Sequence, residues 1–234
     1  MAGLTARNWR SWAEGSLNPL LERPRRWDAT DSHWDATDYG TVGSPTTWLV
    51  EGLIRWPAQS RPTFRVDAFV LPLYLPTAAP YGKWLVSLKS ESGGRAFDKP
   101  TPEMKERVAR DIARAANADG LPFLAQVGVL DGFLDHVRSA QARTLSERGA
   151  FAHGEEVGYT EILLGNYDAA AEQLVRQSRD EDDDADWQTE SRRRAAHVLS
   201  LLRAGPELAH AELSQWADQT ATNLGVSRIA HHPT

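Results

Sequence analysis

The chain has 234 residues, of which 41% are hydrophobic and 25% are charged, and its formal net charge is −6. This length allows one large domain or two small ones. The absence of cysteine excludes disulfides, thiolate metal sites and thiol nucleophiles. No run approaches the roughly 18 to 20 apolar residues of a membrane span, and residues 1–26 lack the apolar core of a signal peptide. We therefore expect a cytoplasmic protein with no membrane contact, and the negative charge disfavours nucleic-acid binding.

The first part of the chain has a helical pattern followed by alternating patterns. Residues 4–23 have helical apolar spacing, which Pro19 should bend. Residues 24–45 are loop-like and contain the pentapeptide Trp-Asp-Ala-Thr-Asp twice. Alternation of apolar and polar residues then predicts antiparallel strands covered on one face. The expected strands are residues 48–56, 64–70 and 84–88, with a short further strand at 95–97.

The remainder of the chain predicts helices. Thr101 should cap a helix that ends near Gly120, and helical spacing resumes over residues 124–145 with a break near Gly128 or Gly132. Because the strands are segregated from the helices, the order indicates an α+β fold with an N-terminal helix, an antiparallel sheet and a helical C-terminal region. The expected organisation is an α+β domain over residues 1–150, a helical region packed on it over 151–229, and a tail over 230–234.

A helical-hairpin signature lies in the C-terminal third of the chain. Gly158 and Ala170 are small enough to let two helices approach closely, and Gly165 can adopt a positive φ between them. Tyr167 should fill the wedge, and Leu174 continues the buried stripe of the second helix. This spacing resembles a tetratricopeptide-type hairpin. A second helix pair is expected over residues 187–202 and 207–224, separated by Gly205-Pro206.

Several polar groups could carry chemistry. Asp28 and Asp35 lie in the duplicated pentapeptides and His33 lies between them, and oxygen-rich clusters of this kind can hold divalent cations. His153 and Glu156 lie three residues apart and would share one helix face. No complete catalytic, metal or cofactor motif is present, so no catalytic residue, metal ligand or cofactor is predicted. The arginine run at 192–194 is expected to be a solvated helix face.

Interface candidates come from tryptophans outside the clearest strands and from an acidic run that should form an exposed loop. They are Trp9, Trp12, Trp27, Trp34, Asp180, Glu181, Asp182, Asp183 and Asp184.

The order of helix, sheet and late helical hairpin resembles that of uncharacterised bacterial proteins often associated with toxin-immunity loci. That resemblance implies a non-enzymatic protein that binds another protein, either as an adaptor or as an immunity protein that blocks a toxin. Its acidic charge would speed the capture of a basic partner. Two alternatives stay open: a metal- or carboxylate-dependent enzyme that uses the Asp and His groups above, and a helical regulatory module that binds a peptide in the hairpin groove.

Overall fold

The structure is a computed structural model that describes residues 11–22, 28–34, 37–57, 63–76, 84–98, 101, 103–148, 151–179 and 186–226. For residues 28–34, 37–45, 57, 186 and 187 it describes the backbone but not the side chains. The fold is α+β, as the sequence predicts: an N-terminal helical segment and an antiparallel sheet precede a helical C-terminal region. Among the described residues, no helix is both long and apolar enough to span a bilayer.

The chain forms two compact units. The sheet unit consists of residues 1–71, 77–128 and 221–234, and the helical unit consists of residues 72–76 and 129–220. This division groups residues 129–150 with the later helices, whereas the sequence places the boundary around residue 150. It also assigns the short segment Pro72–Pro76, which begins at the last residue of a strand of the sheet, to the helical unit.

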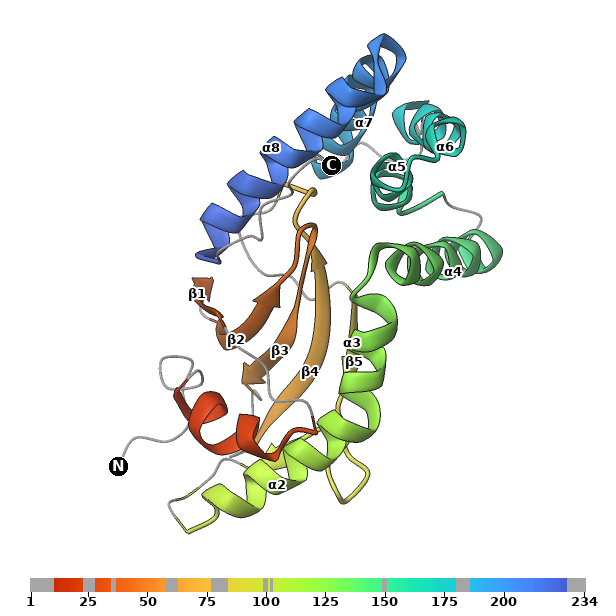
Figure 1. Cartoon of the computed structure of the whole chain (residues 1–234). Helices are drawn as coiled ribbons and strands as arrows, with labels where there is room; N and C mark the ends of the chain where they lie inside the picture. The colour runs from red at the N-terminus through yellow and green to blue at the C-terminus, as the bar shows by residue number, and fades with distance from the viewer. Residues whose placement is uncertain are drawn as a thin grey trace. The chain divides into compact units, whose positions relative to one another are not determined.

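The strands of the sheet unit follow the order β1-β2-β3-β4-β5, and β6 also pairs with β4. Their bounds are β1 Asp28–Trp34, β2 Thr37–Pro45, β3 Leu49–Pro57, β4 Thr63–Pro72, β5 Trp84–Ser87 and β6 Phe97–Asp98. The strands predicted from alternation are confirmed as β3, β4 and β5, and the short further strand as β6. Figure 1 shows the run of helices from α2 to α3 along the side of β4 and β5.

The expectation of a loop over residues 24–45 is wrong, because β1 and β2 lie within it. The two strands pair in register from Asp28 with Gly43 to Trp34 with Thr37, and β2 pairs in turn with β3. Asp and Gly are depleted in strands, so propensity argued against this hairpin. Backbone pairing with β3 decides the conformation instead, which is a tertiary effect that local pattern does not reveal.

The burial of side chains in β4 also differs from the expectation that only one face of the sheet is covered. Phe64, Val66, Ala68 and Val70 are fully buried on one face. Asp67 on the opposite face is equally buried, with one oxygen bonded to Arg65, and its other oxygen has no partner. The prediction that polar side chains of these strands face solvent is therefore wrong at this position.

The N-terminal helical segment is short and irregular. The π-helical turn η1 (Ala13–Leu17) buries Ala13 and Leu17 completely, and η2 (Asn18–Leu20) is a 3₁₀ turn with Pro19 in its first positions. The Asn117 side chain accepts from the Glu22 amide at 3.1 Å and donates to the Leu20 carbonyl at 3.3 Å. The predicted helix is thus confirmed over residues 11–20, and residues 4–10 lie outside the description.

The first long helical run differs from the prediction at both ends. The helix α2 (Lys105–Ala115) begins after Thr101, whose hydroxyl donates to Glu103 instead of capping the helix. The run continues through η3 (Ala116–Gly120) into α3 (Leu121–Val127) and ends at Gly128. Gly120 does not end the helix; a Cβ there would lie 3.2 Å from Leu88 and 3.5 Å from Ala68, so glycine permits close packing on the sheet.

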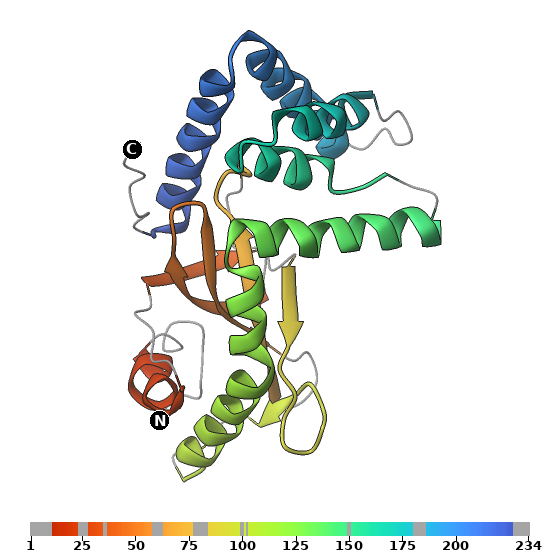
Figure 2. The same ribbon diagram turned by 45° about the vertical axis from the view of Figure 1, so that its right-hand side comes forward.

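The helical unit contains α4 (Leu130–Arg148), α5 (Gly154–Leu163), α6 (Tyr167–Arg179), α7 (Asp186–Ala204) and most of α8 (Pro206–Leu224). Figure 2 shows α5 beside α6, and α6 beside α7. The second predicted helix pair is confirmed as α7 and α8, joined at Gly205.

The α5–α6 hairpin confirms most of the predicted packing. A Cβ on Gly158 would lie 2.7 Å from Leu174, so only glycine allows this approach. Gly165 has φ +81°, its amide donates to Ile162, and the Asn166 amide donates to Glu161, which is a Schellman ending. Tyr167 is 42% exposed and does not fill the wedge between the helices, so that part of the prediction is wrong.

Candidate functional site

The helix α5 is unusual because polar and charged residues lie in the interior of the helical unit. Every residue from Gly154 to Ile162 is buried, and these include Glu155, Glu156 and Glu161. Buried carboxylates are costly unless they are paired and hydrogen-bonded. The partners of these three side chains therefore decide whether they are structural or available for chemistry.

The Glu155 carboxylate is fully hydrogen-bonded. Arg194 of α7 forms a bidentate ion pair with it, in which Nε donates to Oε1 at 2.9 Å and Nη2 donates to Oε2 at 2.8 Å. The Tyr159 hydroxyl donates to Oε1 at 2.9 Å, and the Ser191 hydroxyl donates to Oε2. Gln177 of α6 in turn donates to Ser191 at 3.2 Å. This network joins α5, α6 and α7 and leaves Glu155 no oxygen for a reacting proton.

The surroundings of this network favour the neutral hydroxyl of Tyr159 and the charged guanidinium of Arg194. Burial, together with the negative charge of Glu155 and the hydrogen bond to it, raises the pKa of the Tyr159 hydroxyl well above its usual value. For Arg194, burial opposes the charged form, but the hydrogen bond and charge of Glu155 outweigh it and raise the pKa of the guanidinium. A phenol that stays protonated and an arginine that stays charged are stable structural donors.

A second network links α5 to the segment Pro72–Pro76. The Thr160 hydroxyl donates to the Glu156 carbonyl, so the hydrogen bond of 2.6 Å between Tyr74 and Thr160 is donated by the tyrosine. Tyr74 is completely buried, and burial raises the pKa of its hydroxyl. The Thr220 hydroxyl of α8 donates to the Leu75 carbonyl at 3.3 Å. This segment is therefore held on two sides within the helical unit.

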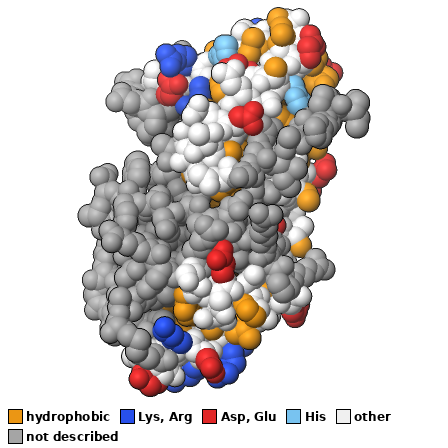
Figure 3. Space-filling model, turned by 60° about the vertical axis from the view of Figure 1, so that its left-hand side comes forward, with side chains coloured by type: hydrophobic (Ala, Val, Ile, Leu, Met, Phe, Trp, Pro, Cys, Tyr) orange, Lys and Arg blue, Asp and Glu red, His pale blue; other side chains and the backbone are white. Residues whose placement is uncertain are grey.

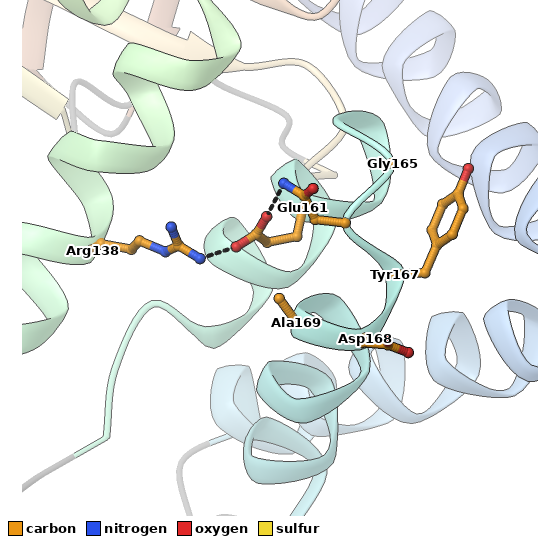
Figure 4. Close-up of a pocket in the computed structure, with 7 residues that line it drawn as sticks. Arg138, Glu161, Gly165, Tyr167, Asp168 and Ala169 are labelled. Carbon is orange, nitrogen blue, oxygen red and sulfur yellow. Dashed lines mark hydrogen bonds and ion pairs between the residues drawn. The ribbon is translucent and has the colours of Figure 1, made fainter.

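The third buried carboxylate borders an open cavity of about 470 Å³. Glu161 accepts hydrogen bonds from Arg138 of α4 and, at 2.8 Å, from the Asn166 side chain. Figure 4 shows these contacts, with Tyr167 pointing away from Arg138. Gly165 and the first residues of α6 form the rest of the wall. Since both oxygens of Glu161 are bonded, this carboxylate also acts as a structural link, here between α4 and α5.

The helices α7 and α8 border a different groove of about 430 Å³, which we call the Trp216 groove. Its wall is formed by Pro76, Glu190, Arg193, Arg194, His197 and Trp216. The Trp216 ring meets Tyr159 edge to face, with centroids 5.7 Å apart, and lies 6.5 Å from the His197 ring. Two residues of the wall are thereby connected to the Glu155 network: Trp216 through its contact with Tyr159, and Arg194 through its own bonds to Glu155.

The charged residues of the Trp216 groove differ in how firmly they are held. Arg194 is 23% exposed and anchored on Glu155, whereas Arg193 is 78% exposed and pairs with Glu190 at 2.9 Å. His197 Nε2 lies 3.2 Å from Glu212 of α8. The space-filling view in Figure 3 shows, on one face of the molecule, acidic, basic and hydrophobic side chains of the described residues lying close to one another.

The structure describes only some of the predicted interface residues. Trp9, Trp27 and the acidic run Asp180, Glu181, Asp182, Asp183 and Asp184 lie outside the described residues. Trp34 lies in β1, but its side chain is not described. Trp12 is 8% exposed, so most of its surface is covered within the sheet unit. These residues are therefore not brought together into a described surface, and their role stays a prediction.

The residues of the enzyme alternative are also dispersed. Asp28 and His33 lie in β1 without described side chains, and Asp35 is not described. His153 precedes α5 with φ +63°, and its Nδ1 lies 3.6 Å from Glu156. Within the part of the chain that the structure describes, no group of three or more His, Cys, Asp or Glu side chains could hold a metal ion.

Sequence reasoning did not single out the Trp216 groove. The arginine run at 192–194 and the apolar character of Trp216 were visible in the sequence. However, Trp216, Arg194 and Pro76 come from three separate segments, so only the packing of these segments reveals that they share one wall. Comparison with known proteins gives no match, whether to protein-family models, to curated proteins or to solved structures.

Proposed function

We propose that this chain is a non-enzymatic protein that binds another protein, as an adaptor or in a toxin-immunity-like role, and that the Trp216 groove is a contact site. The observation that carries the proposal is a tryptophan at the surface of an open groove between helices, next to arginines. Trp and Arg are enriched among the residues that dominate binding energy at protein interfaces. The helix pair α7–α8 supplies a rigid support for such a site.

The buried carboxylates support this proposal over a catalytic one. Glu155 and Glu161 have the burial expected of catalytic acids, but each carboxylate is occupied by hydrogen bonds from neighbouring helices. A general base must be able to reach the proton that it removes. Groups bonded in this way instead hold the helices in a fixed arrangement, which is what a binding surface requires.

The test uses the tagged full chain expressed in its source cells, followed by purification and mass spectrometry. We compare the natural chain with Arg193→Glu, which reverses an exposed charge on the groove, and with Arg203→Glu, which makes the same change at an exposed position of α7 outside it. We expect one protein partner at near-stoichiometric yield with the natural chain and with Arg203→Glu, and recovery about tenfold lower with Arg193→Glu, a change of about 1.4 kcal/mol.

Two results would contradict parts of the proposal. If the natural chain captures no partner through gel filtration, protein binding is wrong. If Arg193→Glu and Arg203→Glu capture the same partner equally, the chain binds proteins, but another surface makes the contact. Circular dichroism of each variant confirms that the fold is retained.

A further inference from the structure

We infer that the open cavity beside Glu161, which we call the Asp168 cavity, binds an arginine side chain of a protein partner. Its wall is formed by Arg138, Glu161 and residues 165–169, all within the helical unit and none shared with the Trp216 groove. This inference rests on the proposed function in one respect, that the chain binds another protein, and it adds the chemistry that the partner presents.

The charged side chains of the wall leave one negative charge without a counter-charge. They are Arg138, Glu161 and Asp168. Arg138 is bonded to Glu161, so these two charges compensate each other. Asp168 is exposed, and its carboxylate has no hydrogen bond or ion pair with any residue that the structure describes. The wall therefore complements a cation.

A second carboxylate lies one helical turn away from the cavity. Glu172 follows Asp168 by four residues on α6, so the two exposed side chains share one face of the helix. Glu172 has no ion pair within the described part of the chain, and Arg176, a further turn along, lies over the Phe151 ring at 4.6 Å. The amides at the start of α6 offset part of the Asp168 charge, and Glu172 adds to the negative potential of this face. The net charge of −6 has the same sign, so long-range attraction favours the same kind of partner.

The exposed ring of Tyr167 favours arginine over lysine as the bound cation. Tyr167 is 42% exposed and lines the cavity, and Figure 4 shows its side chain directed away from Arg138. A planar guanidinium stacks on an aromatic ring while its N–H groups pair with a carboxylate. The ammonium of lysine is a compact point charge, so it does not combine these two contacts in the same way.

Asn166 supplies a further acceptor on the same wall. Its Nδ2 donates to Glu161 at 2.8 Å. Because an ionised carboxylate only accepts hydrogen bonds, the other polar atom of the Asn166 side chain is the carbonyl oxygen. That Oδ1 atom has no hydrogen bond with a described residue. The cavity thus offers a carboxylate, an amide oxygen and an aromatic ring, and the five donors of a guanidinium match this set.

The experiment titrates the full-length chain with capped ten-residue peptides of glycine and serine and follows the backbone amide signals of residues 165–169 by NMR. Three peptides carry two central arginines, two lysines or two citrullines, the last being the uncharged analogue of arginine. N-acetylarginine amide is the small-molecule probe, and it lacks the second arginine that is available to Glu172 in the peptide. We expect the arginine peptide to bind at least tenfold more tightly than each of the other three probes.

Matched variants identify the groups that make the contact. Asp168→Asn removes the carboxylate and should weaken binding of the arginine peptide about tenfold. Asp131→Asn makes the same change at an exposed aspartate in the first turn of α4, outside the cavity, and should leave binding unchanged. Tyr167→Leu should reduce the preference for arginine over lysine to about threefold or less, whereas Tyr167→Phe keeps the ring and should retain the preference.

Every other result overturns the inference. A preference of less than tenfold over the lysine or citrulline peptide shows that the cavity does not select a guanidinium, and equal binding of the small probe shows a small-molecule site. Equal losses in Asp168→Asn and Asp131→Asn show that Asp168 makes no contact. If no probe shifts these signals although a cellular partner is captured by the natural chain and lost with Arg193→Glu, the proposed function stands and this inference fails. If neither measurement finds binding, both fail.

Discussion

At the scale of single residues, the helical unit depends on charges buried in pairs. Glu155 is the clearest case, because one carboxylate accepts from Arg194, Tyr159 and Ser191. Breaking a buried pair by removing one member is costly, since the other charge then lacks its partner. Stability measurements on single variants therefore test whether the network is structural.

Replacing Glu155 by alanine should lower the free energy of unfolding by about 3 kcal/mol, toward the lower end for buried pairs because Arg194 is partly exposed. Urea denaturation followed by circular dichroism measures the change. The control Glu190→Ala removes an exposed partner of Arg193 and should cost less than about 1 kcal/mol. Similar losses for the two variants would show that burial of Glu155 is not what stabilises the unit.

The buried tyrosines predict loss of stability at high pH. Because the folded state raises the pKa of Tyr74 and Tyr159, their contribution is fully present below the unfolded value of about 10 and is lost as pH rises toward the folded values. The free energy of unfolding should fall by about 1.4 kcal/mol per pH unit for each tyrosine above pH ~10. Urea denaturation at a series of pH values above about 10 measures how steeply the free energy of unfolding falls with pH.

The matched variant for this experiment is Tyr74→Phe. It removes one of the two titrating groups, so the alkaline slope should become shallower even though stability at neutral pH also changes. An unchanged slope would mean that Tyr74 already ionises normally in the folded chain.

At the scale of elements, the α5–α6 hairpin is set by a glycine at the closest approach. Gly158→Val places a branched side chain where a single Cβ would already lie 2.7 Å from Leu174. We expect a loss of about 2 kcal/mol from overpacking. In a Leu174→Ala background, the same substitution should cost less, because the smaller residue leaves room. Chemical denaturation of the four chains measures this coupling, and strictly additive effects would contradict the close contact.

At the scale of elements, local sequence pattern predicted some features of the two hairpins correctly and missed others. Gly165 and Leu174 behave as predicted because helix endings and apolar stripes depend on neighbours within a few residues. Tyr167 does not, because its direction depends on the position of α4 and α5 around the cavity. The β1–β2 hairpin was missed for a related reason: its pairing with β3 is not encoded in its own composition.

At the scale of the whole molecule, the helical unit includes a segment distant in sequence. Leu73 and Tyr74 are completely buried, and Thr220 binds the Leu75 carbonyl. A fragment of residues 129–226 lacks this segment, so we expect it to melt at lower temperature and with lower cooperativity than the helical unit in the full chain. Thermal unfolding by circular dichroism and amide hydrogen exchange of α5 measure the difference. Equal protection of α5 in both would show that the segment is dispensable.

The sequence by itself determined the class of fold, the strands β3 to β6 and the helix pairs, because each follows from local periodicity and from glycine or proline at the ends. Only the tertiary structure decided the pairing of β1 with β2 and the burial of Asp67. It also decided that Arg194 and Trp216 share one groove with Pro76. The groove joins residues far apart in the chain, and the β1–β2 hairpin depends on its pairing with β3. A single sequence records which residues are present but not which of them meet.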